Sequence, residues 1–239
     1  MKTRQAHKII IALDVNTGKQ ALDLADKLDM ARIFKIGLEL FTAEGPSLFR
    51  EMKKRKKRIF LDLKLHDIPN TVAGAVSAGT EHGIHMMTLH ASGGLEMMRR
   101  AGEAAASAAQ KTGHPRPLLL GVTVLTSLRS QELNEIGMIE DTEAQVLRLA
   151  QLAKLAGMDG VVCSPWEIDL IKGKYGKDFL VVSPGIRPAW AAAQDQKRIM
   201  TPAQAVQKGA DYIVIGRPIS KAPSPSQALE AIVKELEES

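Results

Sequence analysis

One short stretch of the sequence carries acidic and basic residues at a spacing suited to catalysis. In the run R-I-F-L-D-L-K-L, Asp62 and Lys64 are two residues apart, and Asp67 follows three residues after Lys64. Side chains two residues apart in an extended strand project from the same face. A carboxylate and an ammonium group fixed there can stabilise developing charge, and the ammonium group can also deliver a proton. We interpret this stretch as the centre of an active site.

The alternation along this run predicts the direction of its side chains. The four odd-numbered residues from 59 to 65 are isoleucine or leucine, and we expect this apolar face to pack on surrounding helices. Asp62 and Lys64 then point the other way. The same reasoning directs Asp14, Lys35 and His90 inward from three other predicted strands. Charged groups from neighbouring strands are therefore expected to converge.

The predicted cluster of Lys35, Asp62, Lys64 and Asp67 contains two cations and two anions. Each charge costs several kcal/mol to remove from water when it is isolated. At ~4 Å and an effective dielectric constant near 20, each opposite pair regains about 4 kcal/mol. A purely structural salt-bridge network is the alternative, but such a network gains little over an apolar core. We therefore interpret this cluster as functional and not as a purely structural network.

Two glycine-containing basic segments near the C-terminus predict a phosphate site. The motif S-P-G-I-R at residues 183–187 and the motif I-G-R-P at residues 215–218 each follow a predicted strand. Glycine lets backbone N–H groups approach a phosphate, and Arg187 and Arg217 can offer planar donor pairs. The connection over residues 188–200 is long, and we expect it to act as a lid.

Eight short runs rich in isoleucine, valine and leucine predict the elements that position these residues. They span residues 9–15, 33–38, 59–65, 86–91, 118–125, 161–164, 179–183 and 212–216. Nearly continuous apolar runs are typical of parallel strands covered on both faces. Segments with helical spacing lie between them, for example at residues 19–28, 94–111 and 142–156.

Local signals support this alternation of strands and helices. Thr201 and Pro202 are predicted to begin a helix as its cap and first residue. Gly83, Gly157 and Gly209 each follow a helical stretch, where a left-handed glycine is expected to end the helix. The sequence thus predicts a (β/α)8 TIM barrel forming one catalytic domain over residues 1–239. A doubly wound open sheet is the alternative.

Composition narrows the class of protein. The 239 residues carry a net charge of +5 and include one cysteine, Cys163, which we expect to be a buried, unreactive thiol in a cytoplasmic protein. No run of about 18 apolar residues predicts a membrane span. The basic run at residues 53–58 is interpreted as the solvated C-terminus of a helix, with nucleic-acid binding as the alternative.

The segment F-L-D-L-K-L-H-D-I-P-N-T at residues 60–71 resembles the signature of the orotidine 5′-phosphate decarboxylase family. Further matches cover nearly the whole chain: A-L-D ending at Asp14, F-K-I-G around Lys35, L-T-S around Thr126, P-G-I-R ending at Arg187, and D-Y-I-V-I-G-R-P at residues 211–218. The D-x-K-x-x-D core is shared with related sugar-phosphate enzymes, whereas H-D-I-P-N-T with these flanks is highly specific.

The resemblance implies a carboxy-lyase that converts orotidine 5′-monophosphate to UMP and carbon dioxide, the last step of pyrimidine nucleotide synthesis. It implies a homodimer with composite active sites, and neither a metal nor an organic cofactor. It implies that Lys64 donates the proton to C6 and that Asp62, fixed by Lys35, lies beside the departing carboxylate. Asp67 and Thr71 would reach into the partner's site near the ribose.

The remaining contacts that the resemblance implies fall into three groups. They are Asp14 and Lys35 at the ribose hydroxyls, Thr126 and Ser127 at the pyrimidine, and Gln196, Gly216 and Arg217 at the phosphate, with Arg187 close by. No role is predicted for Trp166 or Trp190. The histidines His82 and His85 are expected to be structural or solvated.

Two rival functions make different predictions. A related 3-keto-gulonate 6-phosphate decarboxylase or hexulose phosphate synthase would use magnesium, held partly by an acidic residue on the second strand. That position is Lys35 here, and a cation repels a metal ion. A non-catalytic nucleotide- or RNA-binding protein would instead bind through residues 53–58, with salt-sensitive affinity that does not depend on Lys64.

Overall fold

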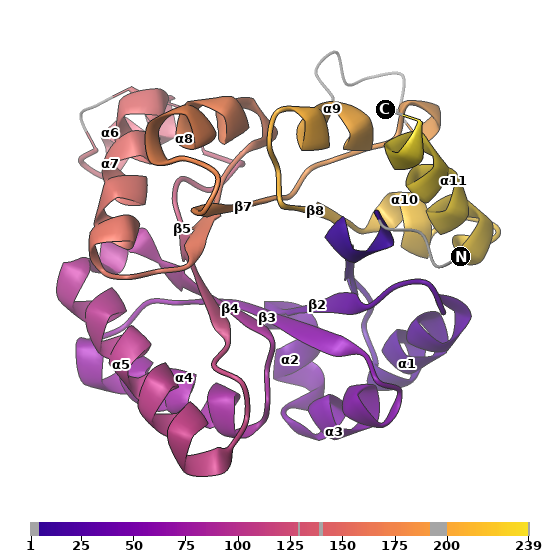
Figure 1. Cartoon of the computed structure of the whole chain (residues 1–239), viewed down its shortest axis with the longest axis horizontal. Helices are drawn as coiled ribbons and strands as arrows, with labels where there is room; N and C mark the ends of the chain where they lie inside the picture. Colours follow the sequence, from indigo (N-terminus) through magenta and orange to yellow (C-terminus); the bar gives the residue numbers. More distant parts are fainter. Residues whose placement is uncertain (1–4, 129, 139–140, 192–199, 239) are drawn as a thin grey trace. The chain divides into compact units, whose positions relative to one another are not determined.

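All eight predicted strands form, and they close into a parallel barrel in chain order (Figure 1). The computed structural model describes residues 5–128, 130–138, 141–191 and 200–238. The strands are β1 (Ile9–Ala12), β2 (Ile33–Gly37), β3 (Arg58–Leu65), β4 (Met86–His90), β5 (Leu118–Val122), β6 (Gly160–Val162), β7 (Leu180–Ser183) and β8 (Tyr212–Ile215). The predicted (β/α)8 TIM barrel is confirmed.

The chain divides into two compact units, one of residues 1–62 and 183–239 and the other of residues 63–182. The first contains η1 (Ala6–Lys8), α1 (Gly18–Lys27), α2 (Leu38–Glu44), α3 (Ser47–Lys54), η4 (Ala189–Ala191), α9 (Pro202–Gln207), α10 (Arg217–Ser220) and α11 (Pro225–Glu237). The second contains α4 (Pro69–Glu81), η2 (Ala91–Gly93), α5 (Leu95–Thr112), α6 (Ser130–Glu135), α7 (Thr142–Leu155), η3 (Pro165–Glu167) and α8 (Ile168–Tyr175). The prediction of a single catalytic domain over residues 1–239 stays a prediction.

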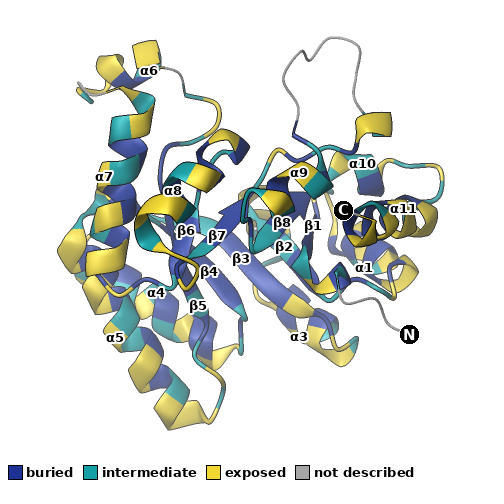
Figure 2. Cartoon of the chain, turned by 45° about the horizontal axis from the view of Figure 1, so that its top comes forward, coloured by how far each residue is buried: buried dark blue, intermediate teal, exposed yellow. Residues whose placement is uncertain are grey.

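In the first unit, β1 pairs with both β2 and β8, and β2 pairs with β3. Ile10, Phe34 and Ile213 have no exposed surface, as expected for strands covered on both faces. Figure 2 shows the same pattern, with buried strands and helices whose exposed residues gather along one side. Burial of these apolar side chains supplies the main driving force for packing the helices onto the strands.

In the second unit, β4, β5, β6 and β7 pair in succession, and α4 lies beside α5 (Figure 1). A Cβ atom added to Gly79 of α4 would lie 2.6 Å from the Cε atom of Met87. Helix α4 therefore packs tightly against the Met87 side chain. This contact confirms that Met87 faces the helices, as the alternation along β4 predicts.

Most strands end before the predicted apolar runs do. The predicted run at residues 118–125, for example, contains β5 only as far as Val122. The residues after three strands still donate one more bond of the parallel type: Leu13 to Lys35 O, Thr123 to Val162 O and Cys163 to Val182 O. The apolar runs therefore include the first residues of the loops, which remain buried although they no longer belong to a strand.

The predicted helix signals are present. Gly83, Gly157 and Gly209 have φ angles of 65°, 75° and 108° after their helices, where a side chain would be unfavourable. The Thr201 hydroxyl accepts from Gln204 N, and Gln204 Oε1 accepts from Thr201 N, so α9 begins with a complete capping box. In the described part of the chain, no helix combines the length and the apolar character needed to cross a membrane.

Candidate active site

Three charged residues meet in the first unit: Asp14, two residues after β1, Lys35 of β2 and Asp62 of β3. The Nζ atom of Lys35 lies 3.4 Å from Asp14 Oδ1 and 3.7 Å from Asp62 Oδ2. The strand register explains the meeting, because Lys35 is paired with Ala12 of β1 and Asp62 with Gly37 of β2. The predicted convergence of Asp14, Lys35 and Asp62 is therefore found in the structure.

This cluster combines a shielded ion pair with a more accessible carboxylate. The Lys35 and Asp62 side chains are 15% and 12% exposed, whereas that of Asp14 is 54% exposed. An ion pair that is mostly removed from water contributes little net stability, since its desolvation offsets its attraction. The stability of the fold does not explain why these charges meet. The exposed Asp14 carboxylate is suited to accept hydrogen bonds from ligand hydroxyls.

Two glycines leave room for the cluster. A Cβ atom on Gly37 would lie 3.1 Å from Lys35 Nζ, and one on Gly216 would lie 2.8 Å from Asp14 Oδ2. Real Cβ atoms essentially never approach an atom as closely as 2.8 Å. Any side chain at residue 216 would therefore displace the Asp14 carboxylate. The sequence pointed to Gly216 as a phosphate contact, and the structure gives this glycine an additional steric role.

Lys64 has an unusual backbone. It lies near the end of β3 with φ of 51°, and its N–H donates to Thr88 Oγ1 over 2.9 Å. The alternation of side chains holds for extended backbone only. It therefore supports the direction of Asp62, which the contact with Lys35 confirms, but it does not by itself give the direction of Lys64.

The loop after β3 is exposed and leads directly into α4. Asp67 Oδ1 accepts from Ile68 N over 2.7 Å, and Thr71 lies in the first turn of the helix. The His66 ring centroid lies 5.5 Å from that of His90 at the end of β4. The sequence did not predict this histidine pair, because residue 66 lies beyond the alternating part of the strand.

Thr126 and Ser127 lie in an exposed turn in the segment after β5. The nearby hydroxyl of Thr123 donates to Val162 O over 3.0 Å, so this segment is tied to β6 at its start. Lys64, Thr126 and Ser127 thus all belong to the second unit, Lys64 on β3 and the other two after β5, as predicted from the sequence. Their contacts with a pyrimidine remain an expectation.

The two glycine-containing loops bring Arg187 and Arg217 to one hollow of about 340 Å³. The sequence did not identify two other residues that line it, Lys221 and Trp190. A backbone bond from Arg187 N to Met200 O joins the two ends of the intervening segment. Gln196 and most of the predicted lid lie outside the described residues. Three cationic side chains around one hollow suit an anion such as phosphate.

A larger hollow, of about 520 Å³, lies away from these residues. It is lined by Ala6, His7, Asp29, Met30, Arg32, Arg55, Lys56 and Lys57, which all precede strands of the first unit. Active sites of α/β barrels lie at the opposite, C-terminal ends of the strands. Size alone therefore does not identify the active site of this chain.

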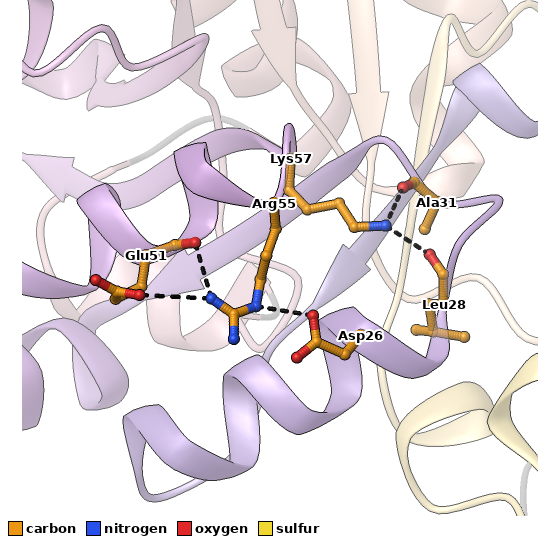
Figure 3. Close-up of polar contacts among 6 residues, drawn as sticks. All are labelled: Asp26, Leu28, Ala31, Glu51, Arg55 and Lys57. Atoms are coloured by element: carbon orange, nitrogen blue, oxygen red, sulfur yellow. Dashed lines mark hydrogen bonds and ion pairs between the residues drawn. The ribbon is translucent and has the colours of Figure 1, made fainter.

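The basic run at residues 53–58 is only partly the solvated helix end that the sequence predicted. Lys53 and Lys54 occupy the last turn of α3, but Lys57 is only 9% exposed. Lys57 Nζ donates to Leu28 O over 2.9 Å and to Ala31 O over 3.2 Å (Figure 3). Burial lowers the pKa of this ammonium group. Lys57 is thus a structural residue.

Arg55 of the same run is also held by neighbouring groups (Figure 3). Its guanidinium group donates to Asp26 Oδ1 over 2.8 Å and to Glu51 O over 3.1 Å. Contacts of this kind occupy the donors that a phosphate backbone would otherwise bind. Two of the six cations in this run, Arg55 and Lys57, are thus held within the protein, whereas Lys53, Lys54, Lys56 and Arg58 are exposed.

Known proteins match this chain over nearly its full length. The model of the orotidine 5′-phosphate decarboxylase / HUMPS family matches residues 7–232. An orotidine 5′-phosphate decarboxylase of Trichlorobacter lovleyi is 52% identical over 231 residues, covering 96% of this chain and 95% of that protein. One of Vibrio cholerae is 50% identical over 230 residues, covering 96% of this chain and 98% of that protein.

The fold is matched as well. The crystal structure of orotidine 5′-phosphate decarboxylase from Lactobacillus acidophilus has a TM-score of 0.85 and 40% identity, covering 96% of this chain and 99% of that one. The signature at residues 60–71 and the charged cluster lie within the matched region. The family model matches residues 7–232, and the two relatives are 52% and 50% identical in sequence. This chain therefore belongs to the orotidine 5′-phosphate decarboxylase / HUMPS family.

Proposed function

We propose that this chain decarboxylates orotidine 5′-monophosphate to UMP and carbon dioxide. The observation that carries the proposal is the contact of Lys35 with both Asp14 and Asp62, at 3.4 Å and 3.7 Å. A cation occupies the second-strand position where magnesium-dependent relatives need an acidic ligand. Relatives of about 50% identity are named for this reaction.

The chemistry suits the residues of the cluster. When the bond from C6 to the carboxylate breaks, its electron pair stays on C6 in the plane of the ring, outside the π system. A fixed cation must therefore stabilise that electron pair where it forms. The Lys64 ammonium group does so and then transfers a proton to C6, giving UMP. The neutral amine regains its proton from solvent.

Asp62 and its neighbours act on the substrate before the bond breaks. The Asp62 carboxylate lies beside the substrate carboxylate and disfavours the bound ground state. Lys35 holds Asp62 in place through their ion pair. Lys35 and Asp14 also bind the ribose hydroxyls. Thr126 and Ser127 bind the pyrimidine. Each of these roles is a proposal that rests on the matched motifs.

The phosphate binds in the hollow between the two arginine-containing loops. Arg187 and Arg217 line this hollow, Gly216 directly precedes Arg217, and Gln196 completes the expected set. Binding energy gained at the phosphate, far from C6, can hold the reacting end of the substrate in position. Trp190 lines the same hollow and is 54% exposed, so its fluorescence can report phosphate binding.

We further propose a cytoplasmic homodimer in which Asp67 and Thr71 complete the partner's active site. Ile68 is 66% exposed and Leu95 is 44% exposed, and these apolar residues follow β3 and β4. Exposed apolar side chains beside proposed site residues fit a surface that a second copy covers. The single cysteine, Cys163, is buried and forms no disulfide, which fits a reducing compartment.

The deciding experiment follows the absorbance of orotidine monophosphate as it is consumed, with EDTA present. We expect full turnover by the wild-type chain, none by Lys64→Ala, and measurable UMP binding by both proteins. Turnover by Lys64→Ala would remove Lys64 from its role. Loss of wild-type turnover on chelation would instead favour the magnesium-dependent relatives.

A further inference from the structure

We propose that Thr88 is a positioning residue for Lys64, acting through the Lys64 backbone. The inference deepens the proposed function, because it concerns the group that protonates C6. The observation behind it is the hydrogen bond from Lys64 N to Thr88 Oγ1, 2.9 Å long, at a residue whose φ angle is 51°. Thr88 is outside the set of site residues identified from the sequence.

The backbone of Lys64 is in an unfavourable region for a residue with a side chain. A positive φ brings Cβ close to the following carbonyl oxygen, so residues other than glycine rarely adopt it. Such conformations persist only where the surroundings hold them, and they gather at functional sites. Lys64 is also the proposed proton donor. An interaction that holds its φ angle therefore acts on the chemistry directly.

Thr88 is built into the barrel at the right place to hold this conformation. It lies on β4 directly after Met87, which packs on Gly79 of α4. Because successive residues of a strand face opposite sides, Thr88 points away from α4. Its side chain has no exposed surface, so its geometry is fixed by packing. A hydroxyl that cannot move offers the Lys64 N–H an acceptor at one position only.

The direction of the Lys64 side chain follows from this backbone angle. Rotation about φ moves the Cα–Cβ bond, and a long side chain multiplies that movement at its ammonium group. When the acceptor at Thr88 is removed, the backbone gains by relaxing toward an extended conformation, which redirects the ammonium group away from C6. A displacement of about 1 Å at a catalytic group can lower a rate about 100-fold.

A purely structural role for the Thr88 hydroxyl makes a different prediction, and Thr80 provides the matched control. Thr80 belongs to the same unit and is also fully buried, and its Oγ1 donates to Val76 O over 2.8 Å within α4. Replacing either threonine by valine removes one buried hydroxyl at nearly constant shape. Only the Thr88 change affects the backbone of Lys64.

The experiment compares Thr88→Val, Thr88→Ser and Thr80→Val by kcat, KM for orotidine monophosphate, UMP affinity and thermal unfolding. We expect Thr88→Val to lower kcat between about 10- and 100-fold, with KM and UMP affinity within about threefold of wild type, since ground-state binding is retained. Thr88→Ser, which keeps the acceptor, should regain most of kcat. Thr80→Val should keep kcat while losing stability.

Three outcomes would overturn the proposal: a Thr88→Val kcat within about twofold of wild type, an equal loss of kcat in Thr80→Val, or no recovery in Thr88→Ser. If Thr88→Val does not fold, Thr88→Cys takes its place, because a thiol is a weak acceptor of similar size; wild-type kcat in that variant would overturn the proposal equally. Lys64→Ala, measured in parallel, separates the two ideas. An inactive Lys64→Ala beside a fully active Thr88→Val refutes only the role of Thr88.

Discussion

At the scale of single residues, two lysines in the described part of the chain adopt backbone angles that usually belong to glycine. Lys56 has φ of 57° and Lys64 has φ of 51°. Lys56 follows α3, where Lys57 N donates to Met52 O and Lys56 N donates to Lys53 O. This pair of bonds is the Schellman arrangement that ends many helices, with glycine preferred at the residue that Lys56 occupies. Its conformation therefore serves to end the helix.

Lys56→Gly is expected to stabilise the protein by about 0.5–1 kcal/mol. Glycine adopts the left-handed conformation without the steric penalty of a Cβ atom, and this gain exceeds the extra flexibility of the unfolded chain. Unfolding in urea measures the change. Lys53→Gly is the matched control, because Lys53 lies inside α3 and the same substitution there should destabilise by up to about 1 kcal/mol. Equal effects of the two changes would contradict the explanation.

Gly216→Ala tests the steric role of the glycine next to Asp14. The new Cβ atom would lie 2.8 Å from Asp14 Oδ2, so the carboxylate must move. We expect kcat/KM for orotidine monophosphate to fall by about tenfold or more, because a displaced carboxylate binds the ribose poorly. Gly173→Ala in α8, where a Cβ atom meets nothing within 4 Å, should leave kcat/KM unchanged. Unchanged activity of Gly216→Ala would show that Asp14 can shift without consequence.

At the scale of elements, the sequence predicted each strand but not how the segment before β3 is held. The apolar residues 59–61 identify the first part of β3, because burial on both faces favours apolar side chains there. The neighbouring Lys57 reads as one more surface cation in a basic run. Its ammonium group can be buried because two backbone carbonyls, one directly after α1 and one in the following loop, accept hydrogen bonds from it. Local composition holds no information about such distant acceptors.

Lys57→Met is expected to destabilise the protein by about 1–3 kcal/mol. Methionine fills much of the same space but removes the ammonium donor from Ala31 O and from Leu28 O, which then keeps only its bond from Ala31 N, and the loss of a buried donor from such acceptors is costly. Urea unfolding measures the loss. Lys53→Met, in the exposed part of the same run, should change stability by no more than about 0.5 kcal/mol. An unchanged free energy of unfolding in Lys57→Met would mean that water replaces the ammonium group at no cost.

The element η3 carries a buried carboxyl group that couples stability to pH. Glu167 accepts from Ser164 N over 2.9 Å and is 8% exposed, and burial raises its pKa to about 7. In the unfolded chain the group titrates near 4.5. Between these values the unfolded state releases a proton that the folded state keeps. The free energy of unfolding should therefore fall as pH rises from about 4.5 to about 7, by up to about 3 kcal/mol.

Glu167→Gln removes this proton while keeping an oxygen that can accept from Ser164 N. We expect the variant to be more stable than the wild type at pH 8, and to lose less stability between pH 5 and pH 8. Thermal unfolding at the two pH values measures both effects. Glu237→Gln, on the exposed end of α11, should not alter the pH dependence. An unchanged pH dependence in Glu167→Gln would assign the slope to other groups.

At the scale of the whole molecule, the sequence predicted the meeting of Asp14, Lys35 and Asp62 because a parallel barrel has few possible registers. Once the strands are known to be neighbours in chain order, residues near their C-terminal ends must come together. The pairing of His66 with His90, and the presence of Trp190 and Lys221 beside the arginines, depend on loop conformation instead. No periodicity describes a loop, so these could not be predicted.

The proposed dimer predicts that two inactive variants restore activity when they exchange subunits. If Lys64 acts in its own site and Asp67 acts in the partner's, a dimer of one Lys64→Ala chain and one Asp67→Ala chain contains one complete site and one that lacks both residues. In an isologous dimer the two chains are equivalent. In an equal mixture of the two variants, half of all dimers therefore contain one chain of each and are called hybrids. Mixing the two inactive variants under conditions that exchange subunits should then restore about a quarter of wild-type turnover per chain.

The time course and the controls distinguish this outcome from simple contamination. Activity should rise with the rate of subunit exchange, and each variant alone should stay inactive under the same conditions. Lys64→Ala mixed with Asp62→Ala serves as the matched control, because both residues belong to the same side of the site and every hybrid site lacks one of them. No restored activity in the mixture of Lys64→Ala and Asp67→Ala would mean that each chain supplies its own Asp67 and that its active site is complete without a partner. Restored activity in the control would instead contradict the placement of Lys64 and Asp62 on the same side of the site.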